Sequence, residues 1–195
     1  MRTAVIAVIA VLGAIAASVV VYPTGLGRRY LAPLFYRGGR PTAAGRRLNR
    51  AWSWLVSNGL TPERWPGQPV IGPATIETRG RRTGERCSNM VTWVEYEGER
   101  YLVSMLGERS DWVRNSRAAG GDAVIRHGRR RAVSLVEVPL AERAPIIRAW
   151  YQRTVSSTKL HLGLESTADI AEFERVAPAH PVFRIAYRNV AGGGA

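Results

Sequence analysis

The sequence predicts an α+β domain in which a meander of antiparallel strands is flanked by helices and preceded by one apolar helix. Three observations predict this class. The first 22 of the 195 residues form an apolar segment with a single charged side chain, at Arg2. Short β-rich segments separated by turn residues dominate the middle of the chain, and apolar residues at helical spacing precede and follow them. About 150 to 170 residues remain behind the apolar segment, which suits one globular domain.

The apolar segment predicts a transmembrane anchor over residues 1–22. From Thr3 to Tyr22 the chain has no charge and is rich in Ala, Val and Ile. A helix of about twenty residues, rising 1.5 Å per residue, crosses a hydrocarbon core of about 30 Å. A cleaved secretory signal is the alternative, because Ala14-Ile15-Ala16 and Ala16-Ala17-Ser18 offer small residues near a cleavage point. The uninterrupted length favours the anchor.

Positive charge is concentrated behind this segment. The net charge is +13, and the first 62 residues hold eight arginines and no acidic residue. Seven of these follow the apolar segment: Arg28, Arg29, Arg37, Arg40, Arg46, Arg47 and Arg50. The bias predicts a single-pass protein of the cell membrane whose globular domain faces the cytoplasm. We interpret residues 23–41 as a basic juxtamembrane linker that contacts an anionic leaflet, with a solvated linker as the alternative.

The domain itself is expected over residues 42–190, with a flexible tail at 191–195. It begins with a helix from Thr42, which can cap it, to about Asn58, and Gly59 stops the helix. Leu48, Trp52, Leu55 and Val56 share one face of this helix.

Five strands are predicted next, at residues 74–78, 87–96, 100–104, 123–127 and 132–138. Glu97-Gly98 and Gly128 suit tight turns between neighbouring strands, so strand pairing is expected to be local. A helix over 140–157 follows, in which Pro145 is tolerated only in the first turn. A short helix over 168–176 and a last strand over 182–188 with one buried face complete the domain.

Cysteine and histidine content excludes several kinds of site. Cys87 is the only cysteine, so no intrachain disulfide and no thiolate metal cage can form, and we expect it to be buried on its strand. His127, His161 and His180 lack ligand-like spacing, so we predict no metal site and place them on the surface or in loops. No Ser/His/Asp or Cys/His set is evident, and the catalytic residue stays unassigned.

The basic composition also suits a non-enzymatic module that binds a membrane surface or a nucleic acid. No groove-reading motif is present, so we predict no nucleic-acid partner.

An Arg- and Gly-rich segment at residues 78–86 is the strongest candidate for ligand binding. Gly80 and Gly84 allow a tight turn, and four arginines and Thr83 surround it. Backbone N–H groups and guanidinium groups bind phosphate oxygens, and glycine lets the backbone approach closely. A solvated hairpin turn is the alternative interpretation.

A second segment, residues 104–115, leaves a strand, passes Gly107 and enters a helix that Ser110 or Asp111 can cap. This geometry brings free N–H groups near Trp112, which is equally suited to a ligand contact or to a core position. Arg114 and Asn115 are expected to be exposed.

Together these segments resemble the deazaflavin-dependent nitroreductase-like proteins, the mycobacterial and actinobacterial group of the split β-barrel flavoproteins. The resemblance covers roughly residues 45–140, and it rests on residues 77–84, Ser88-Asn89-Met90, residues 101–107, residues 111–120 and the strands through Val138. It implies a split β-barrel that binds coenzyme F420, with FMN as the alternative cofactor. It also implies hydride transfer from the reduced cofactor to a small acceptor, and the predicted membrane anchor favours a hydrophobic one such as a quinone, a lipid, or a nitro or enone compound. Because related barrels are often dimers, a homodimer is among the implied arrangements.

The resemblance also implies the cofactor-binding residues. Arg81, Arg82, Thr83, Gly84 and Arg86 would hold the phosphate or its tail, and Ser88 and Met90 would line the ring site. Met105, Leu106 and Gly107 would present backbone groups to the ring, and Trp112, Val113, Arg114 and Asn115 would close over it. Tyr151 and Ser88 are candidate proton donors. The family often has Pro at the position of Met90, and its tyrosine-rich C-terminal segment is only loosely echoed, so nitro-drug reduction is not expected.

Overall fold

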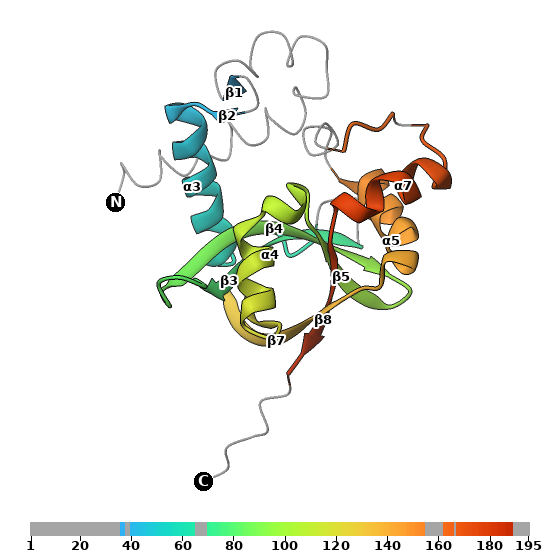
Figure 1. The fold of residues 1–195 in the computed structure, drawn as a ribbon. Coiled ribbons are helices and arrows are strands. Elements are labelled where there is room, and N and C mark those ends of the chain that lie inside the picture. Colours follow the sequence, from blue (N-terminus) through green and yellow to red (C-terminus); the bar gives the residue numbers. More distant parts are fainter. Residues whose placement is uncertain (1–35, 38–39, 65–69, 155–161, 166, 189–195) are drawn as a thin grey trace.

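The computed structural model describes residues 36–37, 40–64, 70–154, 162–165 and 167–188. Six antiparallel strands form a closed barrel in the order β3-β4-β5-β8-β7-β6, in which β6 pairs back to β3 (Figure 1). The strands are β3 (Ile71–Arg79), β4 (Arg86–Tyr96), β5 (Glu99–Val103), β6 (Asp122–His127), β7 (Arg129–Glu137) and β8 (Val182–Tyr187). This antiparallel barrel with flanking helices confirms the predicted α+β class and is consistent with a split barrel.

The predicted turns are present between neighbouring strands. Glu97 and Gly98 join β4 to β5 with φ values of 50° and 79°, the left-handed conformation that a two-residue hairpin requires. Gly128, with φ of 67°, joins β6 to β7.

Strand pairing is less local than predicted. The prediction is confirmed for β3-β4-β5 and for β6-β7, which are hairpins. It is wrong for the closure of the barrel, because β8 lies between β5 and β7, where Leu102 pairs with Phe183 and Leu135 pairs with Ile185. The β3–β6 pair is also non-local, with Ile76 opposite Ile125. Turn residues specify hairpins, but they carry no information about such distant pairs.

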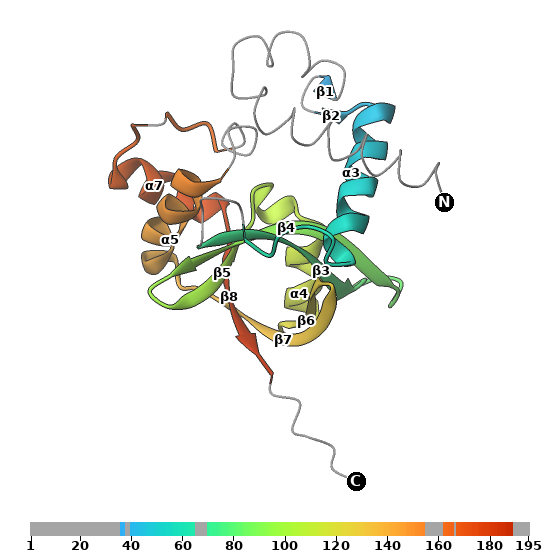
Figure 2. The ribbon, with the colours of Figure 1, turned by 180° about the vertical axis from the view of Figure 1, so that it is seen from behind.

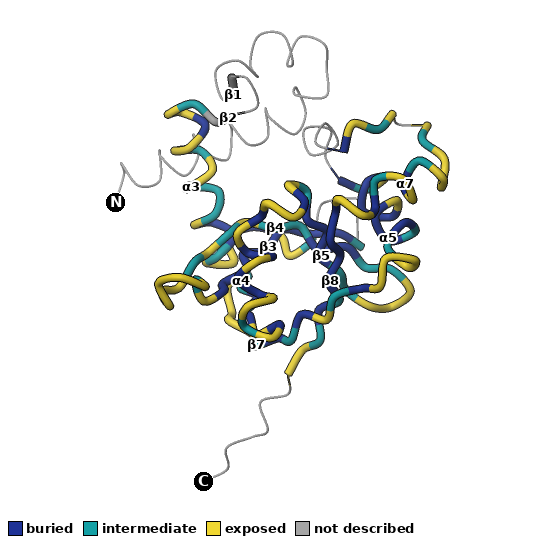
Figure 3. The backbone as a smooth tube through the Cα atoms, in the orientation of Figure 1, coloured by how far each residue is buried: buried dark blue, intermediate teal, exposed yellow. Residues whose placement is uncertain are grey.

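Two apolar clusters hold the domain together. Inward-facing residues of all six strands, among them Ile76, Trp93, Leu102 and Phe183, fill the barrel. A second cluster on the outer side of β4, β5 and β8 includes Val182 and packs against helices. The last strand therefore buries both Val182 and Phe183, on opposite faces, where one buried face was predicted. Figure 3 shows the buried strands grouped around the barrel.

Helices cover two sides of the barrel (Figures 1 and 2). On one side lies α3 (Ala43–Ser57), which Thr42 caps as predicted, with its hydroxyl accepting a hydrogen bond from the N–H of Gly45. On the other lie α5 (Leu140–Arg153) and α7 (Ile170–Val176). Two short 3₁₀ helices, η2 (Gly107–Arg109) and η3 (Ala177–Ala179), and a two-residue pair, β1 (Tyr36–Arg37) with β2 (Arg40–Pro41), complete the described elements.

Pro145 lies inside α5, beyond the first turn, so the predicted restriction on its position is wrong. A proline in a helix interior costs about 3 kcal/mol. The helix persists because Ile146, Ile147, Trp150 and Tyr151 are buried against the outer cluster. Packing in the folded domain therefore outweighs the local preference.

The two ends of the barrel differ. At one end, Arg100 lies over the Trp93 ring at 4.2 Å and donates a hydrogen bond to Glu63. At the other end, where β3 stops and β4 starts, α4 (Asp111–Ala118) inserts Trp112 and Val113 into the barrel core. We call this second end the barrel mouth.

The predicted anchor over residues 1–22, most of the basic linker and the tail fall outside the described residues. In the part of the chain that the structure describes, no helix combines the length and apolar character needed to cross a membrane.

Candidate functional site

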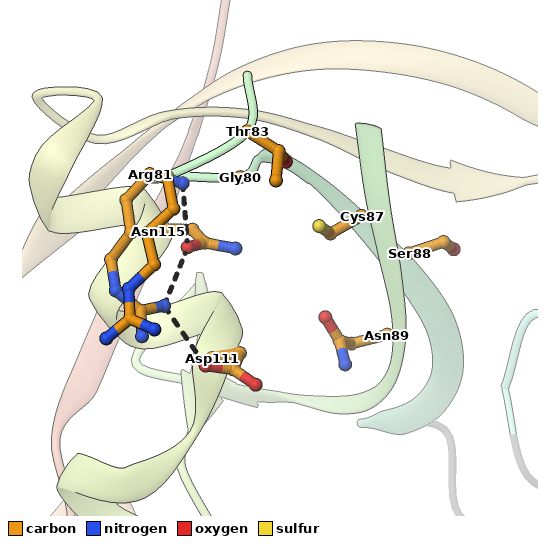
Figure 4. A pocket seen from close by; sticks show the side chains of 9 residues that line it. Gly80, Arg81, Thr83, Cys87, Ser88, Asn89, Asp111 and Asn115 are labelled. Carbon is orange, nitrogen blue, oxygen red and sulfur yellow. Dashed lines mark hydrogen bonds and ion pairs between the residues drawn. The ribbon is translucent and has the colours of Figure 1, made fainter. Parts of the chain in front are cut away.

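A cavity of about 430 Å³ opens at the barrel mouth (Figure 4). Three elements supply its walls: the turn between β3 and β4, the first residues of β4, and one face of α4. The lining residues are Gly80, Arg81, Arg82, Thr83, Cys87, Ser88, Asn89, Asp111 and Asn115. The Arg- and Gly-rich segment, which was the strongest candidate for phosphate binding in the sequence, therefore contributes to the lining of a cavity.

The turn over Gly80–Glu85, called the glycine turn below, is closed by its own backbone. The N–H of Gly80 donates to the Glu85 carbonyl at 2.7 Å, and the N–H of Gly84 donates to the Gly80 carbonyl at 2.8 Å. The hydroxyl of Thr83 accepts from the N–H of Glu85 at 3.3 Å. Gly84 has φ of 70°, a conformation that favours glycine. The turn is thus held in shape before any ligand binds.

Asn115 of α4 fixes the glycine turn to the barrel. Its side-chain oxygen accepts hydrogen bonds from the N–H of Arg81 at 3.2 Å and from the guanidinium of the same residue at 3.0 Å. Its amide nitrogen donates to the hydroxyl of Thr78. Asn115 is only 2% exposed, so the prediction of an exposed side chain is wrong. The cause is its position on the barrel-facing side of α4, next to the turn.

Arg81 and Arg82 differ in how they are held. The guanidinium of Arg81 also forms an ion pair with Asp111 at 3.0 Å, so part of its donor capacity is used within the protein. Arg82 is exposed, and its guanidinium has no partner among the described residues. The backbone N–H groups of Arg82 and Thr83 also have no acceptor there. These groups give the glycine turn free donors and an unpaired positive charge.

Strand β4 places alternate side chains on opposite sides. Cys87 and Asn89 point into the cavity, and the Ser88 side chain points away from it (Figure 4). Met90, two residues further, follows Ser88 onto the outer face and is 44% exposed. Cys87 is half-buried at the cavity, so its predicted burial is wrong. Ser88 is thus a cavity residue whose side chain points away, and Met90 is not among the residues that line the cavity.

On that outer face, arginines surround a buried carboxylate. Glu77 is 6% exposed and accepts hydrogen bonds from the guanidinium of Arg130, whose Nε lies 3.1 Å from Oε2. Arg126 and Arg86 form longer ion pairs with Glu77, at 3.8 and 3.9 Å. Arg86, a predicted phosphate contact, is therefore directed in part toward Glu77.

The segment after β5 forms a rigid turn. The hydroxyl of Ser104 donates to the Gly107 carbonyl at 2.8 Å and contacts the Ser110 hydroxyl at 2.8 Å. The Ser110 hydroxyl is used in this contact, and no side-chain cap is formed on α4. The Nδ1 atom of His180 lies 2.9 Å from the Ser104 carbonyl oxygen, and His180 lies in the loop between η3 and β8, one of the two predicted locations, where it is buried.

Met105, Leu106 and Gly107 lie in this turn and do not line the 430 Å³ cavity. Leu106 is 54% exposed, whereas Gly107 is buried. Of the four residues predicted to close over the cofactor, Trp112 and Val113 have side chains in the barrel core, and Trp112 meets Phe183 edge to face. Arg114 is exposed and donates to the carbonyls of Glu108 and Arg109. Cofactor contacts by these residues stay predictions.

An ionic network anchors the other side of α4. Arg117 donates hydrogen bonds to Glu108 and Glu137, and Arg143 of α5 donates to Glu137 at 2.9 Å. The hydrogen bonds from Arg117 hold the pKa values of both carboxyl groups below their ordinary value. The same bonds raise the pKa of Arg117. The network fixes α4 relative to β7 and α5.

Four cavity residues are not among the predicted cofactor contacts: Gly80, which belongs to the predicted loop, and Cys87, Asn89 and Asp111. The signal for two of them lay in the alternation of β4, because Cys87 and Asn89 are in phase with Trp93, a large apolar residue that packs in the barrel core. Tyr151, proposed as a proton donor, is buried between α5 and α7, where its hydroxyl donates to the Leu164 carbonyl. It is not among the cavity residues. Within the described residues, no group of three or more His, Cys, Asp or Glu is placed to hold a metal ion.

The fold and site together define an antiparallel barrel with an arginine- and glycine-rich turn beside a cavity at its mouth. The model of the F420H(2)-dependent quinone reductase family matches residues 48–160, more than half of the chain. The chain belongs to this family. The match includes the glycine turn, β4 and all of α4, and so covers every residue of the cavity.

Solved structures resemble the chain only distantly. Atu2129 of Agrobacterium tumefaciens is 13% identical, with 70% of this chain and 53% of that chain covered and a TM-score of 0.44. Campylobacter jejuni ChuZ is 12% identical, with 76% and 55% covered and a TM-score of 0.39. An F420-H2 dependent reductase, FDR-A, is 18% identical, with 58% and 92% covered and a TM-score of 0.35. The chain spans about half the length of the first two. No curated protein sequence matches it.

Proposed function

We propose that the protein is an oxidoreductase that binds reduced coenzyme F420 at the barrel mouth and passes its hydride to a small hydrophobic acceptor, with quinones as the leading class. The observation that supports this most directly is the glycine turn, which presents an unpaired arginine and two free backbone N–H groups beside a cavity. Membership of the F420H(2)-dependent quinone reductase family supports the same cofactor and acceptor.

The donors at the barrel mouth fit a phosphorylated cofactor. A phosphate diester carries one negative charge and several acceptor oxygens, and neighbouring N–H groups and a guanidinium can donate to them together. Arg82 and the N–H groups of Arg82 and Thr83 have this capacity unused within the described residues. Gly84, beside which a Cβ would meet no atom within 4 Å, leaves room for close approach. These residues would hold the phosphate.

Each part of the site has a separate task in the proposed reaction. When bound, the cofactor supplies the hydride, and the protein supplies position and surroundings. Asn115 and Arg81 hold the glycine turn at a fixed place on the barrel, so that a ligand gripped by the turn has one orientation. Trp112 and Val113 close the barrel beneath the cavity and exclude water from that side. Neither Tyr151 nor the side chain of Ser88 faces the cavity, so we assign no proton donor.

Titration of the purified protein with F420, followed by its fluorescence, tests the proposal. Binding of F420, and oxidation of its reduced form by a soluble menaquinone analogue faster than without protein, are the expected results. FMN is titrated in parallel, since the turn chemistry also suits its phosphate. If the protein binds FMN and not F420, FMN is the cofactor. If it binds neither F420 nor FMN, a non-enzymatic module is favoured.

We also propose that the protein is a single-pass membrane protein with the barrel on the cytoplasmic side. The support is the uncharged stretch from Thr3 to Tyr22 and the arginines that follow it. A reporter fused to the C-terminus should be shielded from external protease in intact cells. Recovery of the full-length protein in the soluble fraction after lysis would contradict the proposal.

A further inference from the structure

An orphaned amide lies on the wall of the cavity opposite the glycine turn. Asn89 points into the cavity from β4 (Figure 4), and its side chain makes no hydrogen bond with any described residue. Its Oδ1 atom is buried and accepts no hydrogen bond from the part of the chain that the structure describes. Buried acceptors in folded proteins are nearly always paired, so an unpaired one beside a cavity indicates a partner that the folded chain itself does not provide.

Neighbouring side chains cannot supply this donor in the observed arrangement. Asn115 donates to Thr78, and Arg81 donates to Asn115 and Asp111. The thiol of Cys87 is directed to the Glu85 carbonyl, at 3.8 Å. These three side chains are therefore engaged elsewhere, and no other donor of the described residues makes a hydrogen bond to Asn89 Oδ1.

The two walls of the cavity also differ in charge. The turn side carries Arg81 and Arg82, whereas the β4 side presents the uncharged Cys87 and Asn89. A ligand that spans both walls would have an anionic group at the turn and an uncharged, hydrogen-bonding group at Asn89. A phosphate joined to a polyol and a heterocyclic ring has this distribution.

We infer that Asn89 accepts a hydrogen bond from a hydroxyl or ring N–H in the uncharged ring-and-polyol part of the bound cofactor. It then acts as a specificity-determining residue, while the glycine turn binds the phosphate. The inference rests on the proposed function, because it assumes that the cofactor occupies this cavity.

Affinities of two ligands for four proteins test the inference. The ligands are F420 and its phosphate-free deazaflavin fragment, which keeps the ring and polyol. The proteins are the wild type, Asn89→Leu, Arg82→Ala and the control Thr92→Ala, which alters an outward-facing residue of the same strand. Fluorescence titration gives each dissociation constant, and thermal unfolding reports folding.

Asn89→Leu should weaken both ligands about tenfold, the usual effect of one lost hydrogen bond in a partly buried site. Arg82→Ala should weaken F420 and leave the fragment unchanged, and Thr92→Ala should change neither. The Tm of Asn89→Leu should not fall, because the substitution removes an unpaired acceptor. The inference would be overturned if Asn89→Leu bound both ligands with unchanged affinity, or if its affinity fell for F420 but not for the fragment. Failure of the wild type to bind either ligand would instead reject the proposed function.

Discussion

The Asn115 side-chain oxygen accepts two hydrogen bonds from one residue, Arg81, through its backbone N–H and its guanidinium. This double contact joins α4 to the glycine turn in the buried part of the barrel mouth. Asn115→Ala should destabilise the protein by about 1–3 kcal/mol, because the Arg81 N–H loses its acceptor. Asn115→Asp keeps the acceptor oxygen and should be destabilised less than Asn115→Ala. Urea unfolding of both variants measures the difference, and equal losses would show that the contact to Arg81 contributes little.

Arg81 and Arg82 should respond differently to substitution. Arg82→Ala should weaken F420 binding about tenfold, or ~1.4 kcal/mol, with no change in Tm, because this guanidinium has no protein partner among the described residues. Arg81→Ala should lower both the affinity and the Tm, since it also removes contacts to Asp111 and Asn115. Arg148→Ala on the exposed face of α5 is the charge-matched control. A Tm loss in Arg82→Ala equal to that in Arg81→Ala would contradict this division of roles.

Gly107 should tolerate no side chain. It has φ of 63°, and a Cβ there would lie 2.3 Å from the Ala179 carbonyl oxygen. Gly107→Ala should therefore lower the free energy of unfolding by about 2 kcal/mol or more, of which roughly 1 kcal/mol comes from backbone strain. Gly98→Ala, at φ of 79° with no atom within 4 Å of the added Cβ, isolates the strain alone. Chemical denaturation of Gly107→Ala and Gly98→Ala tests the predicted clash, and equal losses of stability in the two variants would argue against it.

The ionic network around Arg117 should make stability depend on acid pH. The pKa values of Glu108 and Glu137 are lowered from 4.5, chiefly by hydrogen bonds from Arg117. Their stabilisation is thus fully present above pH 4.5 and is lost as the pH falls through the lowered pKa values. Arg117→Gln should reduce stability at neutral pH and flatten this dependence. Urea unfolding between about pH 6 and pH 3 measures how the free energy of unfolding depends on pH. Parallel curves for the wild type and Arg117→Gln would show that the Arg117 network does not cause this dependence.

Loss of the buried Glu77 carboxylate should be costly. Glu77→Gln removes the charge that Arg130, Arg126 and Arg86 share, and breaking a buried ion pair costs up to about 3–5 kcal/mol. Because these arginines are partly exposed, we expect the lower part of this range or less. Arg130→Gln, which removes one of the three partners, should cost less than Glu77→Gln. The reverse order in thermal unfolding would mean that Glu77 is not the centre of the cluster.

Helix caps and tight turns could be predicted from the sequence, but strand pairs between segments far apart in the chain could not. Thr42 marks the start of α3, and Glu97-Gly98 marks a hairpin, because a cap and a tight turn depend on a few neighbouring residues. The position of β8 depends on pairs with Leu102 and Leu135, far away in the chain. No local signal specifies such pairs, although they decide whether the sheet closes.

The candidate site shows the same limit. The glycine turn was predicted because its composition suits phosphate, and it lines the cavity. On β4, Ser88 was expected at the ring and is a cavity residue, but its side chain points away, whereas Asn89, which points into the cavity, was given no role. Burial of Asn115 also escaped prediction, because polarity alone suggests exposure, and its partners come from another segment.

The place of β8 in the barrel has a consequence for biosynthesis. This strand comes last of the six, yet it lies between β5 and β7, which leave the ribosome earlier. Until residues 182–187 emerge, the edges of β5 and β7 present unpaired N–H and carbonyl groups to other chains. A nascent protein that stalls before this point should therefore aggregate or require a chaperone, whereas completion of the last strand seals both edges at once.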